Sequence, residues 1–183
     1  MSHFDTSQRD LLHDSAALET ERLRLRPVVA DDLDHFAALY ADPDVMRFIG
    51  LRGPLKREQA RERLDFMLDH WRRHGFGMWS LFLKDGGAFV GRCGMRYMEN
   101  TTEVELGYTL AKAHWGQGLA TEASQAVVRY AFEVMRVSRL VAVADPANTA
   151  SVNVMRKLGM ICEGIGYYYN SECVLYALTC ETP

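Results

Sequence analysis

Two carboxylates and two glycines that lie close together in the chain are the residues whose types and spacing best suit chemistry. Glu103 and Glu105 alternate with apolar residues, and this period of two is typical of a strand with two different faces. Both carboxylates therefore belong to one face, where they either take a proton from a substrate or simply face solvent. Gly116 and Gly118 follow this strand closely.

The two glycines separate the strand from a helix predicted over Leu119 to Met135. Glycine adopts backbone conformations that are closed to other residues and lets a ligand approach closely. The unpaired N–H groups of the first helical turn, together with the helix dipole, favour an anion such as a phosphate. Because Gly116-Gln117-Gly118 matches neither the Walker loop nor the dinucleotide pattern, this stretch predicts an anion site without identifying the anion.

A second motif narrows the choice of anion. Asn148 and Ser151 precede Lys157 to Met160, which reads Lys-Leu-Gly-Met, and Trp115 to Ala123 reads Trp-Gly-Gln-Gly-Leu-Ala-Thr-Glu-Ala. Together these stretches resemble the signatures of the GNAT superfamily of acyl-CoA-dependent N-acyltransferases. The likeness is greatest to the RimJ/RimL-type branch, named for enzymes that acetylate the N-termini of ribosomal proteins. Two early segments also match the usual beginning of that branch: Glu19 to Pro27 and Asp42 to Val45.

The resemblance implies an enzyme that uses acetyl-CoA as a cosubstrate. Acetyl-CoA would lie where the strand ending at Leu110 and a strand at Arg139 to Ala144 splay apart. The backbone near Thr109 and Leu110 would pair with the pantetheine arm, and Asn148 would form a hydrogen bond to it. The pyrophosphate would be held by the backbone N–H groups of Gln117, Gly118, Leu119, Ala120 and Thr121.

In such a family the amine attacks the thioester directly, so the site positions two substrates and gives the ammonium proton a route out. The resemblance assigns proton removal to Glu105 through water, with Glu103 as the second choice. Many relatives carry a tyrosine two residues before the Lys-Leu-Gly-Phe-like stretch that ends the second motif, where this chain has Met155. Ser151 is then the candidate acid for the thiolate and Tyr108 a poorer one, although Ser151 equally suits a helix start that positions CoA.

The remaining pattern predicts one α/β domain of the mixed α+β kind, a GNAT-like and mainly antiparallel sheet flanked by helices. It spans residues 18–183 and follows a loose tail over residues 1–17. Short turns predict an antiparallel meander, and the helix after the glycines predicts a right-handed βαβ crossover that binds the cofactor. The predicted strands are Arg22 to Val28, Phe76 to Lys84, Ala88 to Met98, Glu103 to Leu110, Arg139 to Ala144, Met160 to Tyr168 and Glu172 to Leu178. The predicted helices are Asp31 to Tyr40, Pro54 to His74, Leu119 to Met135 and Asn148 to Leu158.

Composition argues against several classes of partner. The formal net charge of -3 and the pI near 6.1 give no sign of a surface for nucleic acid or anionic membranes. There is no long apolar span, and the first 17 residues are too polar for a signal peptide, so a cytoplasmic location is expected. The four cysteines lack the spacing of a zinc site or a disulfide framework, and no metal is expected.

Two segments are candidates for the wall of the acceptor pocket. They are the connection from Asp42 to Leu51 and the three tyrosines Tyr167, Tyr168 and Tyr169. Aromatic residues in strands more often serve cross-strand packing, so the tyrosines carry both interpretations.

The leading interpretation is a cytoplasmic N-acetyltransferase that transfers the acetyl group of acetyl-CoA to a primary amine, either a peptide N-terminus or a small amine. A homodimer is left open. The alternative is a non-catalytic sensor or interaction module that binds acyl-CoA. Met155 supports that alternative, whereas Glu105, Asn148 and Ser151 argue against it. A nucleotide-binding protein is a third interpretation, and the missing fingerprints make it the weakest.

Overall fold

A single mixed sheet runs through the computed structural model, which describes residues 16–50 and 53–180. Its strands lie in the order β1-β2-β3-β4-β5-β6-β8-β7. Neighbouring strands are antiparallel except β5 and β6, which are parallel, so the predicted meander and βαβ crossover are both confirmed. Their bounds are β1 (Leu18–Glu19), β2 (Leu23–Pro27), β3 (Met78–Leu83), β4 (Phe89–Tyr97), β5 (Val104–Leu110), β6 (Arg139–Ala144), β7 (Ile161–Tyr168) and β8 (Ser171–Thr179).

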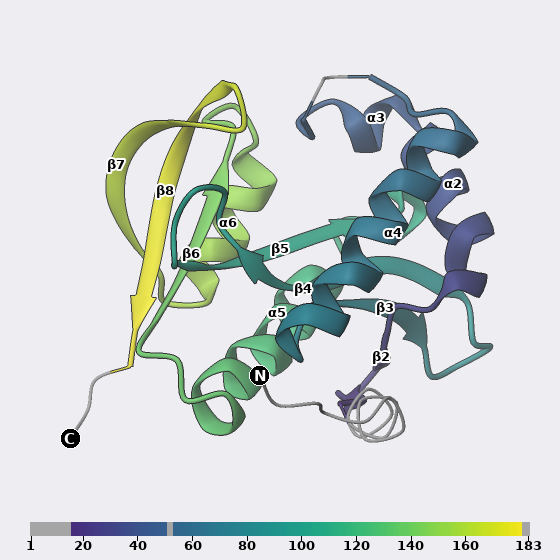
Figure 1. Cartoon of the computed structure of the whole chain (residues 1–183), viewed down its shortest axis with the longest axis horizontal. Helices are drawn as coiled ribbons and strands as arrows, with labels where there is room; N and C mark the ends of the chain where they lie inside the picture. Colours follow the sequence, from purple (N-terminus) through teal and green to yellow (C-terminus); the bar gives the residue numbers. More distant parts are fainter. Residues whose placement is uncertain (1–15, 51–52, 181–183) are drawn as a thin grey trace.

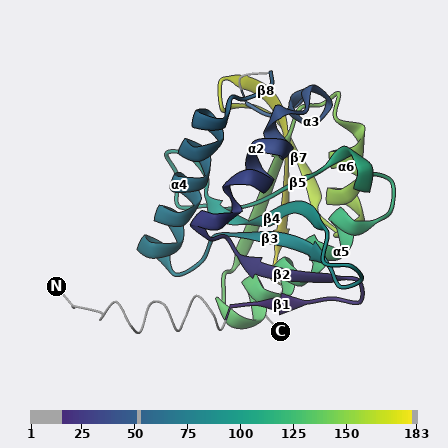
Figure 2. The same cartoon turned by 90° about the vertical axis from the view of Figure 1, so that its right-hand side faces the viewer.

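Helices cover both faces of this sheet (Figures 1 and 2). One group consists of α2 (Leu33–Ala41), α3 (Pro43–Met46) and α4 (Arg57–His74), and the opposite face carries α5 (Leu119–Arg129) and α6 (Thr149–Lys157). Three short turns complete the described elements: η1 (Ala30–Asp32), η2 (Lys112–His114) and the π turn η3 (Tyr130–Val134). None of the helices in residues 16–50 and 53–180 combines the length and the apolar character that a membrane crossing requires.

The helix boundaries differ from the predictions in three places. The predicted first helix begins as a 3-10 turn, and the predicted helix over Leu119 to Met135 becomes a π turn at Tyr130. A short helix, α3, follows Asp42 where the sequence predicts only a connection. Its cause is local, because the Asp42 carboxylate accepts a hydrogen bond of 2.8 Å from the Asp44 N–H and Pro43 has a φ already suited to a first helical turn.

Most of the predicted tail, residues 1–15, lies outside the described residues, as do residues 51–52 and 181–183. The described end of that tail is packed rather than loose. Ala16 is buried, and its carbonyl oxygen accepts a hydrogen bond of 2.7 Å from the indole N–H of Trp79. The strand β1, which the sequence pattern does not predict, pairs with β2 directly after it.

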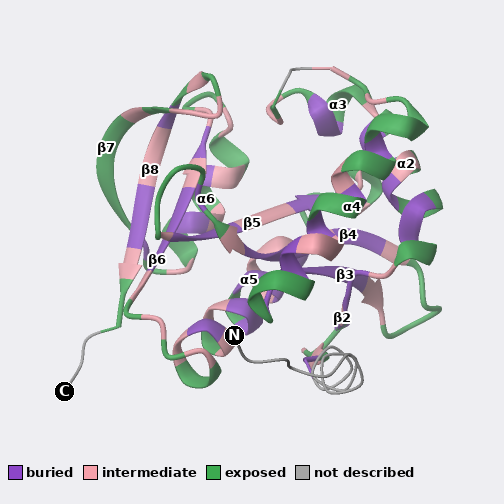
Figure 3. Cartoon of the chain, in the orientation of Figure 1, coloured by how far each residue is buried: buried purple, intermediate pink, exposed green. Residues whose placement is uncertain are grey.

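The apolar core lies between the sheet and its helices (Figure 3). From the sheet it includes the fully buried Trp79 and Met95, and from the helices Phe36, Leu64 and Val127. Strand β7 is different, because most of its residues are exposed. The sheet is therefore best anchored through β3, β4 and β6, of which β4 and β6 are the two neighbours of β5.

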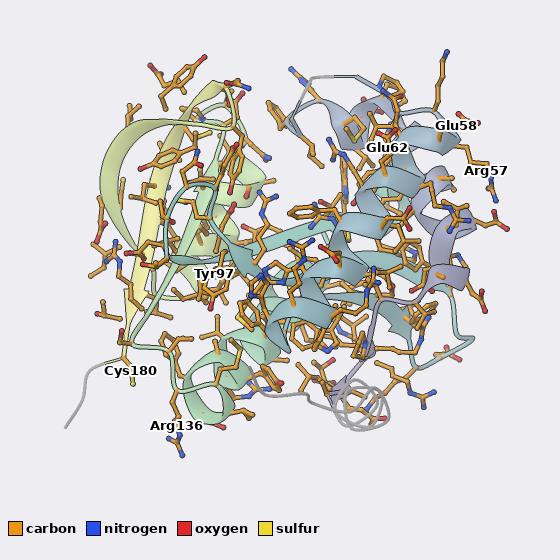
Figure 4. The ribbon with its side chains drawn as sticks, viewed as in Figure 1. Arg57, Glu58, Glu62, Tyr97, Arg136 and Cys180 are labelled. Carbon is orange, nitrogen blue, oxygen red and sulfur yellow. The ribbon has the colours of Figure 1, made fainter. Side chains whose placement is uncertain are left out.

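The C-terminal half of α4 is fixed to the sheet by a buried histidine. The helix ends at Gly75, which has a left-handed φ of 73° and donates its N–H to the carbonyl of Trp71. His70 Nδ1 lies 2.8 Å from the carbonyl oxygen of Phe76, and His70 Nε2 accepts a 3.2 Å hydrogen bond from the N–H of Tyr97, the β4 residue labelled in Figure 4. These partners require the neutral ring with its proton on Nδ1. Burial lowers the pKa of His70.

This arrangement predicts a specific pH dependence of stability. Because the folded pKa of His70 lies below its unfolded value near 6.5, its contribution is complete above about pH 6.5 and is lost as the pH falls below that value. We expect the free energy of unfolding of the wild type to fall more steeply with acidification than that of His70→Gln, by up to about 1.4 kcal/mol per pH unit. Urea titrations from pH 8 to pH 5 measure both curves. Parallel curves would contradict the role of His70.

Candidate functional site

The parallel strands β5 and β6 separate soon after they meet. Val104 pairs with Leu140 and Glu105 with Val141, and no further pair joins the two strands. Strand β5 nevertheless runs on to Leu110, held along its whole length by β4, and β6 is held along its whole length by β8. The predicted splay between these strands is therefore present.

The ladder between β4 and β5 shows which peptide groups of β5 face the gap. Met98 donates its N–H to the Glu103 carbonyl and Ala111 donates its N–H to the Val90 carbonyl, each over 2.8 Å. Because the peptide groups of a strand alternate in direction, those of Thr109 also face β4, and those of Tyr108 and Leu110 face the gap. The Leu110 carbonyl accepts a hydrogen bond of 2.8 Å from the indole N–H of Trp115.

A cavity of about 480 Å³ lies over this region of the sheet, a size typical of small-molecule sites. It extends from α2 and α4, across the middle of β3 to β5, to the ends of β6 and α6 and the β7–β8 turn. Phe48, Ile49 and Gly50 line it, so the described part of the predicted wall from Asp42 to Leu51 does border a cavity. Leu51 itself lies outside the described residues.

Glu105 lines this cavity at the point where β5 and β6 part. Its side chain is buried, and its Oε2 accepts a hydrogen bond from the Tyr169 hydroxyl and one of 3.1 Å from Arg96 Nε. The Arg96 guanidinium in turn lies over the Tyr169 ring, 4.5 Å from its centroid. Among the described residues, none donates to Glu105 Oε1. One carboxylate oxygen is thus fixed, and the other is available to a substrate or a water.

The proton on Tyr169 stays in place at neutral pH. Burial raises the pKa of the Tyr169 hydroxyl, and the charge of Glu105 raises it further. Tyr169 occupies the two-residue turn between β7 and β8 with a left-handed φ of 50°. Of the three predicted tyrosines it alone lines the cavity, whereas Tyr167 is exposed and Tyr168 packs beside Val141 and Ala177.

Glu103, the second-choice base, is placed differently. Its carboxylate forms a 3.1 Å ion pair with Arg139, which also pairs with Glu163. Glu103 does not line the cavity. The two carboxylates that share a strand face in the sequence pattern therefore have separate environments.

The predicted residues Asn148 and Ser151 line the far end of the cavity beside Tyr108. Asn148 caps α6, since its Oδ1 accepts a 3.2 Å hydrogen bond from the Ser151 N–H. The Tyr108 hydroxyl donates to the Ser151 carbonyl and also contacts Ser151 Oγ, both over 2.9 Å. Because a tyrosine has one hydroxyl proton, the Ser151 hydroxyl then donates to Tyr108. Burial raises the pKa of Tyr108, which keeps that proton in place.

Met155, which stands where relatives carry a tyrosine, is fully buried and does not line the cavity. Its side chain belongs to the core beneath α6. Thr109 does line the cavity, and its Oγ1 is the one buried side-chain oxygen without a hydrogen-bond partner among the described residues.

The glycine loop places free backbone donors at the start of α5. Gly116 and Gly118 have left-handed φ values of 73° and 78°, and Gly118 is the residue that precedes the helix. The first N–H that bonds back within the helix is that of Glu122, to the Gly118 carbonyl over 3.0 Å. The N–H groups of Leu119, Ala120 and Thr121 therefore have no acceptor in the described chain, the arrangement that favours an anion.

Glu122 connects this loop to the start of the domain. Its carboxylate accepts hydrogen bonds from Thr20 Oγ1 over 2.6 Å and from the Arg22 N–H over 2.8 Å, and forms an ion pair of 2.6 Å with the Arg22 guanidinium. Arg22 also donates to the Gln117 carbonyl over 2.9 Å. These contacts lower the pKa of Glu122 against the opposing effect of burial.

Comparison with known proteins agrees with this geometry. The family model described as acetyltransferase (GNAT) domain matches residues 22–161. The chain belongs to the GNAT acetyltransferase family. A protein of Bacillus subtilis named YkkB is 36% identical over 146 residues, which cover 78% of this chain and 84% of that protein. An N-acetyltransferase of Bacillus licheniformis named p20 is 30% identical over 149 residues, which cover 81% and 84%. The crystal structure of an acetyltransferase from Agrobacterium tumefaciens superposes with a TM-score of 0.79 at 28% identity, covering 90% and 94%.

Membership of the GNAT family makes this chain an acetyltransferase with the mixed fold expected from its sequence. The predicted base and the Asn148 motif line one cavity at the β5–β6 gap, whereas none of the residues from Gly116 to Thr121 lines it. Sequence reasoning missed Arg96 and Tyr169 as neighbours of the GNAT domain's Glu105. Alternation along β4 carries a signal for Arg96, but only the register shows that it faces Glu105.

The pairing of Arg96 with Glu105 predicts a measurable energetic coupling. Arg96→Met leaves the buried Glu105 carboxylate without its cation, and we expect a loss of about 2 kcal/mol in the free energy of unfolding, less than for a fully buried pair because Arg96 is one-third exposed. The double variant Arg96→Met with Glu105→Gln should recover part of this loss. Urea denaturation of the four proteins gives the coupling energy, and strictly additive effects would contradict it.

Proposed function

We propose that this GNAT domain transfers the acetyl group of acetyl-CoA to a primary amine, with Glu105 accepting the ammonium proton through a water molecule. The observation that carries the proposal is the position of Glu105, a buried carboxylate with one free oxygen on the cavity wall where β5 and β6 part. A base must lie within reach of the proton that it removes, directly or through one water.

The residues around the gap fit acetyl-CoA. The peptide groups of Tyr108 and Leu110 that face the gap would hold the pantetheine arm, with Thr109 lining the cavity through its side chain. The free N–H groups of Leu119, Ala120 and Thr121, with those of Gln117 and Gly118 beside them, would hold the pyrophosphate. The Asn148 side-chain N–H₂ would donate a hydrogen bond to the pantetheine, because the side-chain oxygen of Asn148 already caps α6.

Acetyl-CoA supplies an acetyl group activated as a thioester, so a C–N bond forms as the C–S bond breaks. The amine loses its proton toward Glu105, and Arg96 and Tyr169 hold the carboxylate in position during that transfer. At the other end of the cavity, Ser151 would protonate the thiolate by turning its hydroxyl proton from Tyr108 toward the sulfur, or would instead position CoA at the start of α6. Main-chain and side-chain groups thus both orient the two substrates.

The motif residues support the proposed placement in the RimJ/RimL-type branch, and the lack of a long apolar span in the sequence supports the proposed cytoplasmic location. The proposed acceptor is either a peptide N-terminus or a small amine. An acceptor must share the 480 Å³ cavity with the acetyl end of the cosubstrate, so its amine-bearing end is small or slender. A homodimer remains compatible with this proposal.

Replacement of Glu105 tests the proton acceptor. Glu105→Gln should lower kcat by about 100-fold or more while changing the KM for acetyl-CoA by less than about threefold, because the change removes the base and leaves the loop intact. Glu103→Gln is the matched control and should keep kcat within about twofold. A rate in Glu105→Gln that equals the wild-type rate at every pH would contradict the proposed role of Glu105 as the base.

Replacement of Gly118 tests the cofactor loop. Acetyl-CoA and CoA should raise the thermal midpoint of the wild type, whereas ATP and NAD at matched concentration should not. Gly118→Ala forces a left-handed φ of 78° on a residue with a Cβ, which costs about 1 kcal/mol and tilts the first-turn N–H groups, so CoA affinity should fall about tenfold.

Gly86→Ala is the matched control for this measurement. Gly86 has a φ of 73° in the β3–β4 turn, and a Cβ there meets no other atom within 4 Å. Gly86→Ala should lower the free energy of unfolding by a similar amount to Gly118→Ala. Its affinity for CoA, measured by calorimetry, should equal that of the wild type. Equal CoA affinity in both variants would show that the loop does not bind the pyrophosphate.

A further inference from the structure

Two arginines on the acceptor side of the cavity have no carboxylate partner. Arg63 comes from α4 and Arg92 from β4, and both line the cavity. Neither takes part in any of the ion pairs among residues 16–50 and 53–180, whereas Arg96, the third arginine of the cavity, is paired with Glu105. Guanidinium groups stay charged at neutral pH, so the cavity carries a fixed positive charge here.

Both arginines are held in place by Tyr40 of α2, which is fully buried. The Arg63 guanidinium lies over the Tyr40 ring, 5.2 Å from its centroid, and Arg92 Nε donates to the Tyr40 hydroxyl over 2.7 Å. The connection before residue 51 closes over Arg63, because a Cβ on Gly50 would lie 3.0 Å from Arg63 Nη2. These contacts fix the two side chains but neutralise neither of them.

The Arg92 guanidinium, which comes from β4, lies beside the part of β5 that carries the proposed base. A Cβ on Gly107 would be 3.7 Å from Arg92 Nη1. Gly107 is two residues beyond Glu105 on one face of the strand, a spacing of about 7 Å. A ligand that places an amine near Glu105 can therefore place another group, several bonds away, beside Arg92.

The other charged groups of the cavity leave this site positive. Arg96 is paired with Glu105, and Asp145 lies at the end of β6, where its Oδ1 accepts a 2.9 Å hydrogen bond from the Ala147 N–H. Glu62 is exposed on α4 and forms no ion pair with Arg63 or Arg92 among the described residues. Figure 4 shows Glu62 about one turn along α4 from Arg57 and Glu58, which point away from the body of the protein.

Burial lowers the pKa of Arg63, and the charges of Arg92 and Arg96 lower it further. An anion between the guanidinium groups would relieve both effects, because it restores hydrogen bonds and cancels like-charge repulsion.

Building on the proposed acetyl transfer, we propose that Arg63 and Arg92 bind an anionic group of the acceptor, so that the preferred acceptor is a primary amine that also carries a carboxylate. The shared chemistry has two sources, a small amino acid or a peptide whose first residue is acidic. The same geometry disfavours polyamines, whose second cation would meet the arginines.

Matched acceptors test this specificity by thiol release. Glycine, β-alanine and 4-aminobutyrate are compared with their carboxamides, and peptides that begin with Asp or Glu are compared with those that begin with Asn or Gln. We expect kcat/KM to be about tenfold or more higher for the anionic member of at least one series, and the series that shows it identifies the source. Equal rates within every pair, or a preference for a linear polyamine, would overturn the inference while leaving acetyl transfer intact.

Variants then assign the preference to the two arginines. Arg63→Gln and Arg92→Gln should each reduce the anionic-over-neutral ratio of kcat/KM about tenfold, mainly through KM for the acceptor. Arg63→Lys keeps the charge and should retain most of the ratio. Arg61→Gln, an exposed arginine on the same helix, is the matched control and should change nothing. A ratio unchanged in both glutamine variants would overturn the assignment.

Binding of product analogues separates this inference from the proposed activity. Calorimetry with CoA-saturated protein compares N-acetyl-β-alanine with its carboxamide and needs no turnover. Tighter binding of the carboxylate, lost in Arg63→Gln, supports the anion site even if no acceptor is acetylated. Equal affinity for the two compounds overturns it, whatever the enzyme's rate.

Discussion

The early end of the pairing between β5 and β6 is the constraint on which the rest of the site depends. Each strand is held firmly on its outer edge, β5 by β4 and β6 by β8, so the two cannot close against each other. The peptide groups of Tyr108 and the N–H of Leu110 then face a gap instead of a partner strand, while the Leu110 carbonyl is bonded to Trp115. Unpaired peptide groups in a protein interior are unfavourable, and a ligand with an amide-rich arm is one way to satisfy them. The opening in the sheet is therefore itself a binding feature.

The glycine loop depends on a second constraint, which comes from the other end of the chain. Glu122 belongs to the first turn of α5, yet its partners Thr20 and Arg22 lie about one hundred residues earlier. Arg22 remains partly exposed, so its ion pair contributes little to stability. Its value lies in position, because the same guanidinium holds the Gln117 carbonyl between the two glycines. The opening segment around Arg22 and the glycine loop, which are far apart in the sequence, are thus one structural unit.

The sequence predicts the elements of this site better than its contacts. Alternation identifies the face of Glu105, and the glycines identify the start of α5, because both signals are local. Arg96 and Tyr169 reach Glu105 through strand register and a turn some sixty residues away, which no local period encodes. Asn148 illustrates the same limit, since its oxygen caps α6 and leaves only its N–H₂ for a ligand. The sequence also does not show that Arg63 lacks a carboxylate partner among the described residues, because the same helix carries many other arginines.

The charges around Glu105 connect the choice of acceptor to the chemistry. An amine attacks only as the free base, and positive neighbours favour the loss of its proton. Arg63, Arg92 and Arg96 all face the cavity, and one of them is neutralised by Glu105 itself. The two remaining guanidinium groups would repel a simple ammonium from the site, but an acceptor with its own carboxylate offsets that repulsion at one end. At its other end the amine then meets Glu105 Oε1 in surroundings that disfavour its charged form. A single positive pair thus both selects the acceptor and promotes its deprotonation.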